Sequence, residues 1–308
     1  MTEEPSVSVI IRTIQSRHHL LREAIESVLL QSYPSIEILI IEDGSDVAKE
    51  MVEAIVPYKP SHTIRYFSIP HAGRCAAGNF GLEQAAGEFI NFLDDDDQLY
   101  PTHVESILSA ILKTGGAIAG YADSEEIPTQ FHSLEPLNYQ VGKKKRIRPG
   151  NFSRMELWCR NYLPIQSILF KRELFLKYGG FDLELDCLED WNLWIRYLSE
   201  GEVVYIPEVT SFYRVPINKQ DRQKRNQAFD RYRPLAEEKN RQVKVNLTIG
   251  ELLATSHEFT NKLHLQPVTV AVLQRKVKSS RWLFSLLAYL GQSFERLIQG
   301  LRKVRHLQ

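Results

Sequence analysis

The sequence predicts an α/β protein with a mostly parallel central sheet flanked by helices. Three observations support this fold class. Nearly continuous apolar, β-branched runs occupy residues 7–11, 36–41 and 88–93, as in strands that are buried on both faces of a sheet. Segments with helical spacing of apolar residues separate these runs. Strand, helix and strand joined by short connections are typical of a right-handed crossover between parallel strands.

The first hundred residues alternate between the two kinds of element. A polar stretch and then a helical stripe follow the first strand, and Pro34 ends that helix. Small residues in the second helix permit close packing against its neighbours. The expected elements are strands at 7–11, 36–41, 63–69 and 88–93, and helices at 20–29 and 74–86.

The middle of the chain mixes strands and helices, and β character fades beyond Pro216. Trp191 and Trp194 are expected in the core rather than as sugar-stacking platforms. The expected elements are helices at 101–112, 172–178 and 188–198, strands at 117–122, 165–170 and 203–206, and a basic loop at 142–150.

Charge divides the chain unevenly, although its 38 basic and 38 acidic residues balance. Residues 1–216 hold 20 basic and 31 acidic side chains, whereas residues 217–308 hold 18 and 7. We therefore expect one domain over 1–216, followed by a basic helical extension over 217–308. The zero net charge and the lack of a recognisable module argue against a nucleic-acid partner.

The chain shows no secretory leader or membrane span in its sequence. The longest apolar candidate, Trp282 to Phe294, has 13 residues, too few to cross a bilayer. Three widely spaced cysteines lack zinc-site spacing and fit a reduced compartment. The expected location is cytoplasmic, with peripheral contact at the inner face of the membrane as a further possibility.

The basic tail carries leucines at helical spacing between Leu283 and Leu301, with arginines around them. Such a helix could lie on anionic lipid, which would suit a lipid-linked acceptor. It could equally pack on the acidic catalytic domain or pair with another subunit in a homo-oligomer. The sequence leaves these alternatives open.

The run Asp94-Asp95-Asp96-Asp97 directly follows a predicted buried strand. Adjacent carboxylates repel one another, so a fold accepts them only with compensation. Alternate residues of such a turn can direct two carboxylates at Mg²⁺ or Mn²⁺, which normally also carries substrate phosphates. A solvated acidic turn is the competing interpretation.

Two further carboxylates occupy suggestive positions. Asp43 ends the second strand, where it could accept a hydrogen bond from a pyrimidine base or simply belong to a turn. Asp190 lies in the first turn of a predicted helix, where it could act as a general base or interact with the helix dipole. Glu189 points about 100° away from Asp190 around the helix and should have a different role.

Taken together, these segments resemble a family-2 glycosyltransferase of the inverting GT-A type. They occur in the family's order across about residues 5–215. The resemblance implies that residues 1–216 form a catalytic domain, with a nucleotide-binding half (1–97) and an acceptor half (98–216). The segments that carry the resemblance are residues 7–13, 20–31, 38–45, 73–81, 86–96, 179–182, 189–196 and Tyr213-Arg214.

The resemblance implies roles for the acidic residues. Thr13 and Asp43 match positions around the nucleotide base. Asp94 and Asp96 match the outer residues of the family's Asp-x-Asp motif, which meets the donor ribose and the metal–diphosphate unit. Asp96 is thus the first metal ligand and Asp94 a second. Asp190 matches the catalytic base that deprotonates the acceptor hydroxyl.

Neighbouring residues complete the implied donor site. Asp95 lies inside the Asp-x-Asp motif and is counted with the nucleotide-sugar-binding residues, and Asp97 could assist the metal. Arg12 stands where the family often has Pro, so it contacts phosphate or fills a surface niche. The family's Ala-Arg-Asn stretch lacks its Arg here, and Arg74, one turn earlier, is a candidate substitute.

The expected activity is metal-dependent, inverting sugar transfer from a UDP, dTDP or GDP donor to a glycan or lipid-linked hydroxyl acceptor, in the synthesis of a bacterial surface glycan. One alternative is a non-catalytic nucleotide-sugar-binding or assembly subunit with the same fold. A nucleotidyltransferase is disfavoured because residues 12–19 contain no glycine-rich phosphate loop.

Overall fold

The computed structural model describes residues 4–262. They belong to two compact units, the first comprising residues up to Phe152 together with Arg160–Asn246. The second comprises Ser153–Cys159 and the residues from Leu247 onward. The boundary expected at residue 216 thus lies within the first unit, which also contains the long helix that follows it. The leucine-rich part of the basic tail lies outside the described residues.

The first unit carries the sheet and most of the helices. Its elements are β1 (Val7–Ile14), α1 (His18–Leu29), β2 (Ile36–Asp43), α2 (Lys49–Glu53), β3 (Thr63–Ile69), α3 (Arg74–Gln84), β4 (Phe89–Asp94), β5 (Gln98–Leu99), α4 (His103–Thr114), β6 (Ala117–Leu134), β7 (Leu137–Val141), β8 (Lys145–Ile147), β9 (Ile168–Lys171), α6 (Glu173–Tyr178), α7 (Glu189–Leu198), β10 (Glu202–Pro216) and α8 (Lys219–Gln242). The second unit contains α5 (Arg154–Cys159) and α9 (Ile249–Lys262).

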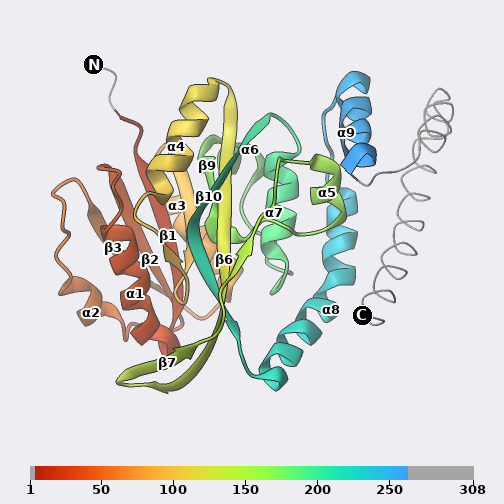
Figure 1. The fold of residues 1–308 in the computed structure, drawn as a ribbon. Helices are drawn as coiled ribbons and strands as arrows, with labels where there is room; N and C mark the ends of the chain where they lie inside the picture. Colours follow the sequence, from red (N-terminus) through yellow and green to blue (C-terminus); the bar gives the residue numbers. More distant parts are fainter. Residues whose placement is uncertain (1–3, 263–308) are drawn as a thin grey trace. The chain divides into compact units, whose positions relative to one another are not determined.

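The strands form one sheet in the order β3-β2-β1-β4-β9-β6-β10-β5, with β7 and β8 paired to β6. Strands β1 to β4 are mutually parallel, and so are β6 and β10. β9 runs antiparallel between β4 and β6. Figure 1 shows β6 and β10 as two long neighbouring strands, with β7 folding back along the end of β6. The α/β class with helices flanking the sheet is confirmed.

The second half of the sheet differs from the expectation in four places. The strand expected at 165–170 is shorter, because Ile165–Ser167 form a 3₁₀ turn before β9. The strands expected at 117–122 and 203–206 extend to Leu134 and Pro216. β8 forms within the expected basic loop. The added part of β6 and all of β8 are mainly polar, and the added part of β10 mixes apolar and polar residues, so no continuous apolar run marks these segments in the sequence.

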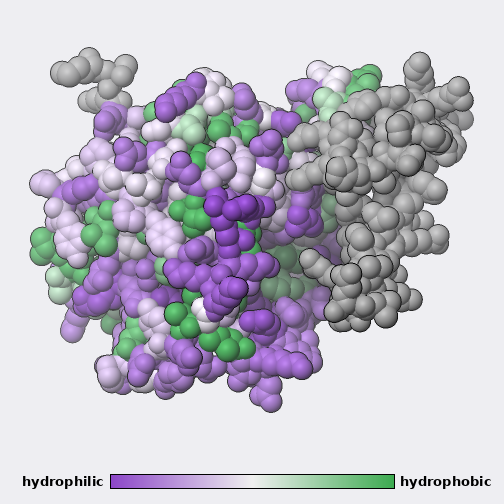
Figure 2. Space-filling view, in the orientation of Figure 1, coloured by the Kyte–Doolittle hydropathy of each residue, from purple (hydrophilic) through white to green (hydrophobic). Residues whose placement is uncertain are grey.

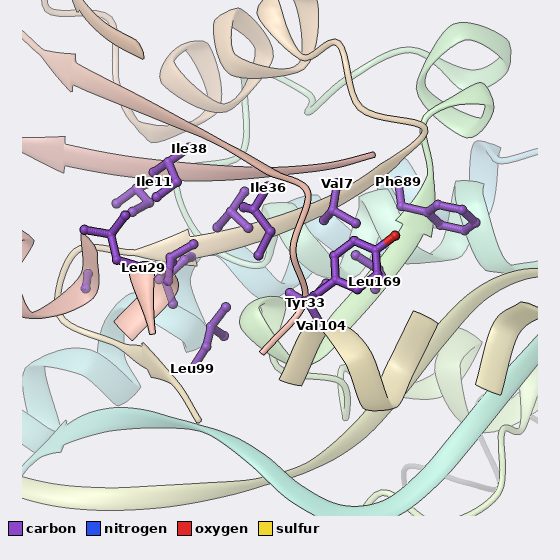
Figure 3. Close-up of a cluster of buried hydrophobic side chains, with 14 of the residues drawn as sticks. Val7, Ile11, Leu29, Tyr33, Ile36, Ile38, Phe89, Leu99, Val104 and Leu169 are labelled. Carbon is purple, nitrogen blue, oxygen red and sulfur yellow. The ribbon is translucent and has the colours of Figure 1, made fainter. Parts of the chain in front are cut away.

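Side chains are sorted between surface and core as expected for an α/β fold. On the face drawn in Figure 2, hydrophilic residues cover most of the described surface and hydrophobic ones form small separate areas. One buried cluster joins the parallel strands to helices α1 and α4. Figure 3 shows Ile11 and Ile38 from the strands close to Leu29, with Val7, Val104 and Leu169 in the same cluster.

Helices α3 and α7 pack closely on the sheet. In α3, a Cβ added at Gly81 would lie 2.4 Å from Ile10 of β1, so this contact requires glycine. On α7, Trp191 and Trp194 are 1% and 0% exposed, which confirms that both are core residues. α7 also meets α8, where Asn192 Nδ2 donates to Asn240 Oδ1 at 2.9 Å. Among the described residues, no helix is both long enough and apolar enough to cross a membrane.

Candidate functional site

The carboxyl ends of three parallel strands bring the predicted residues to one edge of the sheet. In the register of β1 with β4, Arg12 lies opposite Asp94, and in that of β1 with β2, Ile14 lies opposite Asp43. Ligands of open α/β sheets bind beyond this edge. Strand ends that are about 80 residues apart in sequence therefore meet where the sequence placed the site.

Arg12 connects this edge to helix α7. Its Nη2 and Nε donate to Asp94 Oδ1 at 2.6 and 3.0 Å, and its Nη1 lies 3.4 Å from Glu189 Oε1. The guanidinium is almost fully buried and lies over the rings of Phe92 and Phe181. Arg12 therefore does not fill a surface niche: it is the buried cation that balances one carboxylate on each side of the site.

Arg74, at the start of α3, is a second cation beside Glu189. Its Nη1 lies 3.4 Å from Glu189 Oε1, and about half of its side chain is exposed. Burial opposes ionisation of Asp94, but the positive charges of Arg12 and Arg74 lower the pKa of that carboxyl below its usual value. Arg74 thus combines a place in the cluster with access to solvent, as a phosphate-binding group requires.

The inner aspartate of the run, Asp95, faces the protein. Its Oδ2 accepts a hydrogen bond from Thr13 Oγ1 at 2.8 Å, and its Oδ1 accepts one from Arg17 Nη1 at 3.1 Å. Burial raises the pKa of Asp95 to about 7, partly offset by the charge of Arg17. Thr13 and Asp95 hold each other in place at the end of β1.

The turn at Asp96 and Asp97 is fixed by Arg214 of β10. The backbone N–H of Arg214 donates to Asp97 Oδ1 at 3.0 Å, and its guanidinium donates to the carbonyl oxygen of Asp96. Glu23 of α1 in turn holds the same guanidinium, at 2.6 Å. Burial raises the pKa of Asp97, so this carboxyl is poorly suited to remain ionised beside three others.

Asp43 holds the loop before α3. Its two oxygens accept hydrogen bonds from the backbone N–H groups of Ala72 and Gly73, at 2.7 and 2.9 Å. His71 Nδ1 lies 3.1 Å from Oδ2, and its side chain is largely exposed. Gly73 has φ of +89°, a backbone conformation that favours glycine. Asp43 thus shapes the wall beside Arg74 in addition to any contact with a base.

Asp190 is held from two sides at the start of α7. Asn161 Nδ2 lies 2.9 and 3.0 Å from its two oxygens, and the backbone N–H of Trp191 donates to Oδ1 at 2.8 Å. Burial, and then the negative charge of Glu189, raise the pKa of Asp190 to about 7. A carboxylate with this pKa can both exist ionised near neutral pH and accept a proton, which suits a general base.

The acidic run fits a divalent cation that substrate phosphates help to hold. Within residues 4–262 there is no group of three or more His, Cys, Asp or Glu side chains that could hold a metal alone. Asp96 is partly exposed and forms an ion pair with Arg17 at 3.0 Å, whose side chain is also partly exposed. Asp94 Oδ1 is already occupied by Arg12. Asp96 is therefore the better protein ligand, and Mg²⁺ sites with one or two carboxylates are common.

Three residues of this site were not assigned a role from the sequence. Arg17 lies in the connection after β1, a polar stretch with no distinguishing pattern. Asn161 lies in a segment between helices and strands, and only the fold brings it to Asp190. Glu189 was separated from Asp190 by helical geometry alone, and the structure shows where it points: toward Arg12 and Arg74.

The fold matches solved glycosyltransferase structures of the GT-A class. The crystal structure of S. aureus TarS residues 1–349 superposes with a TM-score of 0.60 at 16% identity, covering 83% of this chain and 71% of that one. The mannosyltransferase PcManGT of Pyrobaculum calidifontis gives 0.51 at 17% identity, covering 84% and 81%. At these identities the similarity establishes the GT-A fold.

Sequence comparison identifies the family. The model of glycosyl transferase family 2 matches residues 8–163, about half of the chain. An uncharacterized glycosyltransferase of Rickettsia typhi is 32% identical over 217 residues, 70% of this chain and 65% of that protein. Glycosyltransferase GlyA of Streptococcus pneumoniae is 30% identical over 228 residues, 70% of this chain and 31% of that protein. The chain belongs to glycosyltransferase family 2, and spans less than two thirds of either relative.

Proposed function

We propose that this protein is a metal-dependent, inverting glycosyltransferase that moves a sugar from a nucleotide-diphosphate donor to a hydroxyl acceptor. The observation that carries the proposal is the position of Arg12 between Asp94 and Glu189. Arg12 thereby connects the acidic end of β4, where we place the donor, to the first turn of α7, which carries Asp190. The donor and the acceptor would therefore bind next to each other.

On the donor side, we assign Arg74 and Arg17 to the diphosphate and Asp96 to the cation. Thr13, Asp43, Asp94 and Asp95 shape the nucleotide pocket, and Arg12 neutralises its buried acidic wall. A divalent ion bound there would stabilise the negative charge that gathers on the leaving diphosphate. The related structures support a donor of this kind: TarS was solved with UDP and UDP-GlcNAc, and PcManGT with GDP-Man and Mn²⁺.

On the acceptor side, Asp190 accepts the proton of the attacking hydroxyl. Asn161 and the N–H of Trp191 fix its carboxylate, so that little reorganisation is needed as the proton transfers. A hydroxyl that attacks from the face opposite the leaving diphosphate inverts the anomeric configuration in a single displacement. We place this reaction in the synthesis of a bacterial surface glycan, as the bacterial origin of the relatives supports.

The donor half of this proposal is tested by titrating UDP and UDP-sugars into the protein with and without Mn²⁺, using calorimetry. We expect Mn²⁺ to strengthen binding, and Asp96→Asn to lower the affinity measured with Mn²⁺ by about tenfold or more, since a charged ligand becomes neutral. Asp46→Asn is the matched control, because Asp46 is an exposed carboxylate outside the site. Equal Mn²⁺ dependence in the wild type and Asp96→Asn would refute the assigned metal role.

A further inference from the structure

Residues 143–148, Lys-Lys-Lys-Arg-Ile-Arg, concentrate positive charge in an otherwise acidic part of the chain. We call them the basic segment. They contain five of the 20 basic residues among residues 1–216, where acidic residues number 31. A cluster of like charges is opposed by its own repulsion unless an anion compensates it. The protein itself compensates only some of these cations.

Two cations of the basic segment are paired with acidic side chains of β6 and anchor the segment. Arg146 Nε donates at 2.7 Å to Asp123 Oδ2, on a side chain that is fully buried, and Tyr205 OH donates to the other oxygen at 2.7 Å. Lys144 Nζ lies 3.3 Å from Glu125 Oε2. Residues 145–147 also pair with β6 as strand β8. The segment is therefore held on the sheet at both of these side chains.

The other three cations, Lys143, Lys145 and Arg148, are exposed. None of them has an ion pair or a side-chain hydrogen bond within residues 4–262. The acidic side chains of β6 nearby are already engaged: Glu125 with Lys144, and Glu126 with Tyr213 OH at 3.2 Å. Three fixed positive charges thus remain uncompensated by the part of the chain that the structure describes.

The sheet topology places this charge beside the candidate site. β10 pairs along one edge of β6, and β9, β8 and β7 follow one another along the other edge. Because β9 also pairs with β4, the edge of β6 that carries β8 faces β4, the strand that ends at Asp94. Lys145 lies opposite Glu126, whose partner Tyr213 directly precedes the residue that clamps Asp96 and Asp97.

We propose that the basic segment binds phosphate groups of the acceptor, which is accordingly a phosphodiester-bearing glycan chain. This inference rests on the proposed transferase function and adds the class of acceptor. The donor diphosphate has its own cations in Arg17 and Arg74, so the basic segment is available for a second phosphate-bearing molecule.

The composition of the segment favours a phosphate-bearing chain over two other polyanions. Lipid binding normally adds apolar contacts to charge, whereas the one apolar residue here, Ile147, is half-buried in the strand. Single-stranded nucleic acid is bound by aromatic stacking together with charge, and the segment contains no aromatic residue. The exposed residues of the basic segment offer positive charge without apolar or aromatic contacts. This matches a polymer whose phosphate groups supply the interaction by charge.

The experiment measures binding of a fluorescent glycerol phosphate oligomer to the full chain across a salt series. The test variant is Lys143→Gln/Lys145→Gln/Arg148→Gln, and the control is Arg22→Gln/Lys113→Gln/Lys219→Gln, which removes the same charge from exposed positions elsewhere. Three lost contacts should lower the slope of log affinity against log salt by about 2, at roughly 0.7 per contact. The control should keep the wild-type slope.

Parallel arms separate this inference from the function it rests on. UDP-sugar binding with Mn²⁺ should be equal in the wild type and in both triple variants, because the cations assigned to the donor are intact. If the wild type does not bind the donor, the transferase proposal is refuted, while the result with the oligomer still stands on its own. The inference is overturned if the test variant binds the oligomer like the wild type, or if the wild type prefers phosphatidylglycerol vesicles or oligothymidylate to the oligomer.

Discussion

At the scale of single residues, the site depends on the interactions among Arg12, Arg74, Glu189 and Asp190, which are buried or half-buried. Glu189 lies between two arginines and beside Asp190, so it links the cations of the donor side to the base. Its charge raises the pKa of Asp190, after the larger contribution of burial. We propose different tasks for the two neighbours of the Glu-Asp pair: Glu189 adjusts the electrostatics, and Asp190 takes the proton.

The pH dependence of transfer tests this division. Asp190 must be ionised to accept a proton, so kcat/KM should rise with pH and level off above about 7. In Glu189→Gln the repulsive charge is gone, the ionised form of Asp190 is easier to reach, and the rise should occur about one pH unit lower. Glu184→Gln, which loses an exposed carboxylate at a distance, serves as the control. A rise at the same pH in all three proteins contradicts the assigned role of Glu189.

Arg12 should matter for stability as well as for activity. Arg12→Met leaves two carboxylates without their buried partner, and we expect the free energy of unfolding to fall by about 3 kcal/mol. The double variant Arg12→Met/Glu189→Gln removes one orphaned charge and should lose less than the sum of the two single variants. Denaturant unfolding of the four proteins measures this. Simple additivity would show that Arg12 and Glu189 do not interact.

At the scale of elements, the parallel half of the sheet could be predicted and much of the other half could not. Strands β1, β2 and β4 are announced by apolar runs, because helices cover both of their faces. The extensions of β6 and β10 and the short β8 contain no continuous apolar run, although Ser124, Ser211 and Phe212 within them are buried. Likewise, no sequence pattern marks Asn161, whose contact with Asp190 exists only through the fold.

Helix α4 is joined to β10 by a buried histidine that supplies a test of this packing. His103 Nδ1 lies 2.8 Å from Thr210 Oγ1, and burial lowers the pKa of His103 to about 3. The unfolded chain therefore binds a proton below pH 6.5 that the folded chain does not, so stability falls as pH falls. Between pH 6.5 and 5 this loss should be about 2 kcal/mol.

The contribution of His103 is isolated by comparing the wild type with His103→Gln. Thermal or urea unfolding at several pH values gives the stability difference between the two proteins, in which the other titrating groups cancel. We expect the wild type to lose its advantage over the variant as the pH falls from 6.5 to 5. A difference that is independent of pH would mean that His103 is not held neutral in the folded protein.

At the scale of the whole molecule, the order of the matching segments along the chain predicted the family, and the structure brings the carboxyl ends of β1, β2 and β4 to one edge of the sheet. What the sequence could not supply was the cation between Asp94 and Glu189. Arg12 departs from the Pro that the family often has at its position, and only coordinates show that it pairs with both Asp94 and Glu189. A residue that satisfies two distant carboxylates leaves no local pattern in the sequence.

The central claim is that strand ends and helix α7 form one site in which Asp190 takes the proton of the acceptor. Its most direct test compares wild type, Asp190→Asn and the control Asp230→Asn, which changes an exposed carboxylate on α8, measuring sugar transfer and donor binding in the same preparations. For Asp190→Asn the account predicts unchanged donor affinity and a turnover lower by about 10²- to 10⁴-fold, the usual contribution of a general base. Turnover near the wild-type rate in Asp190→Asn would contradict it.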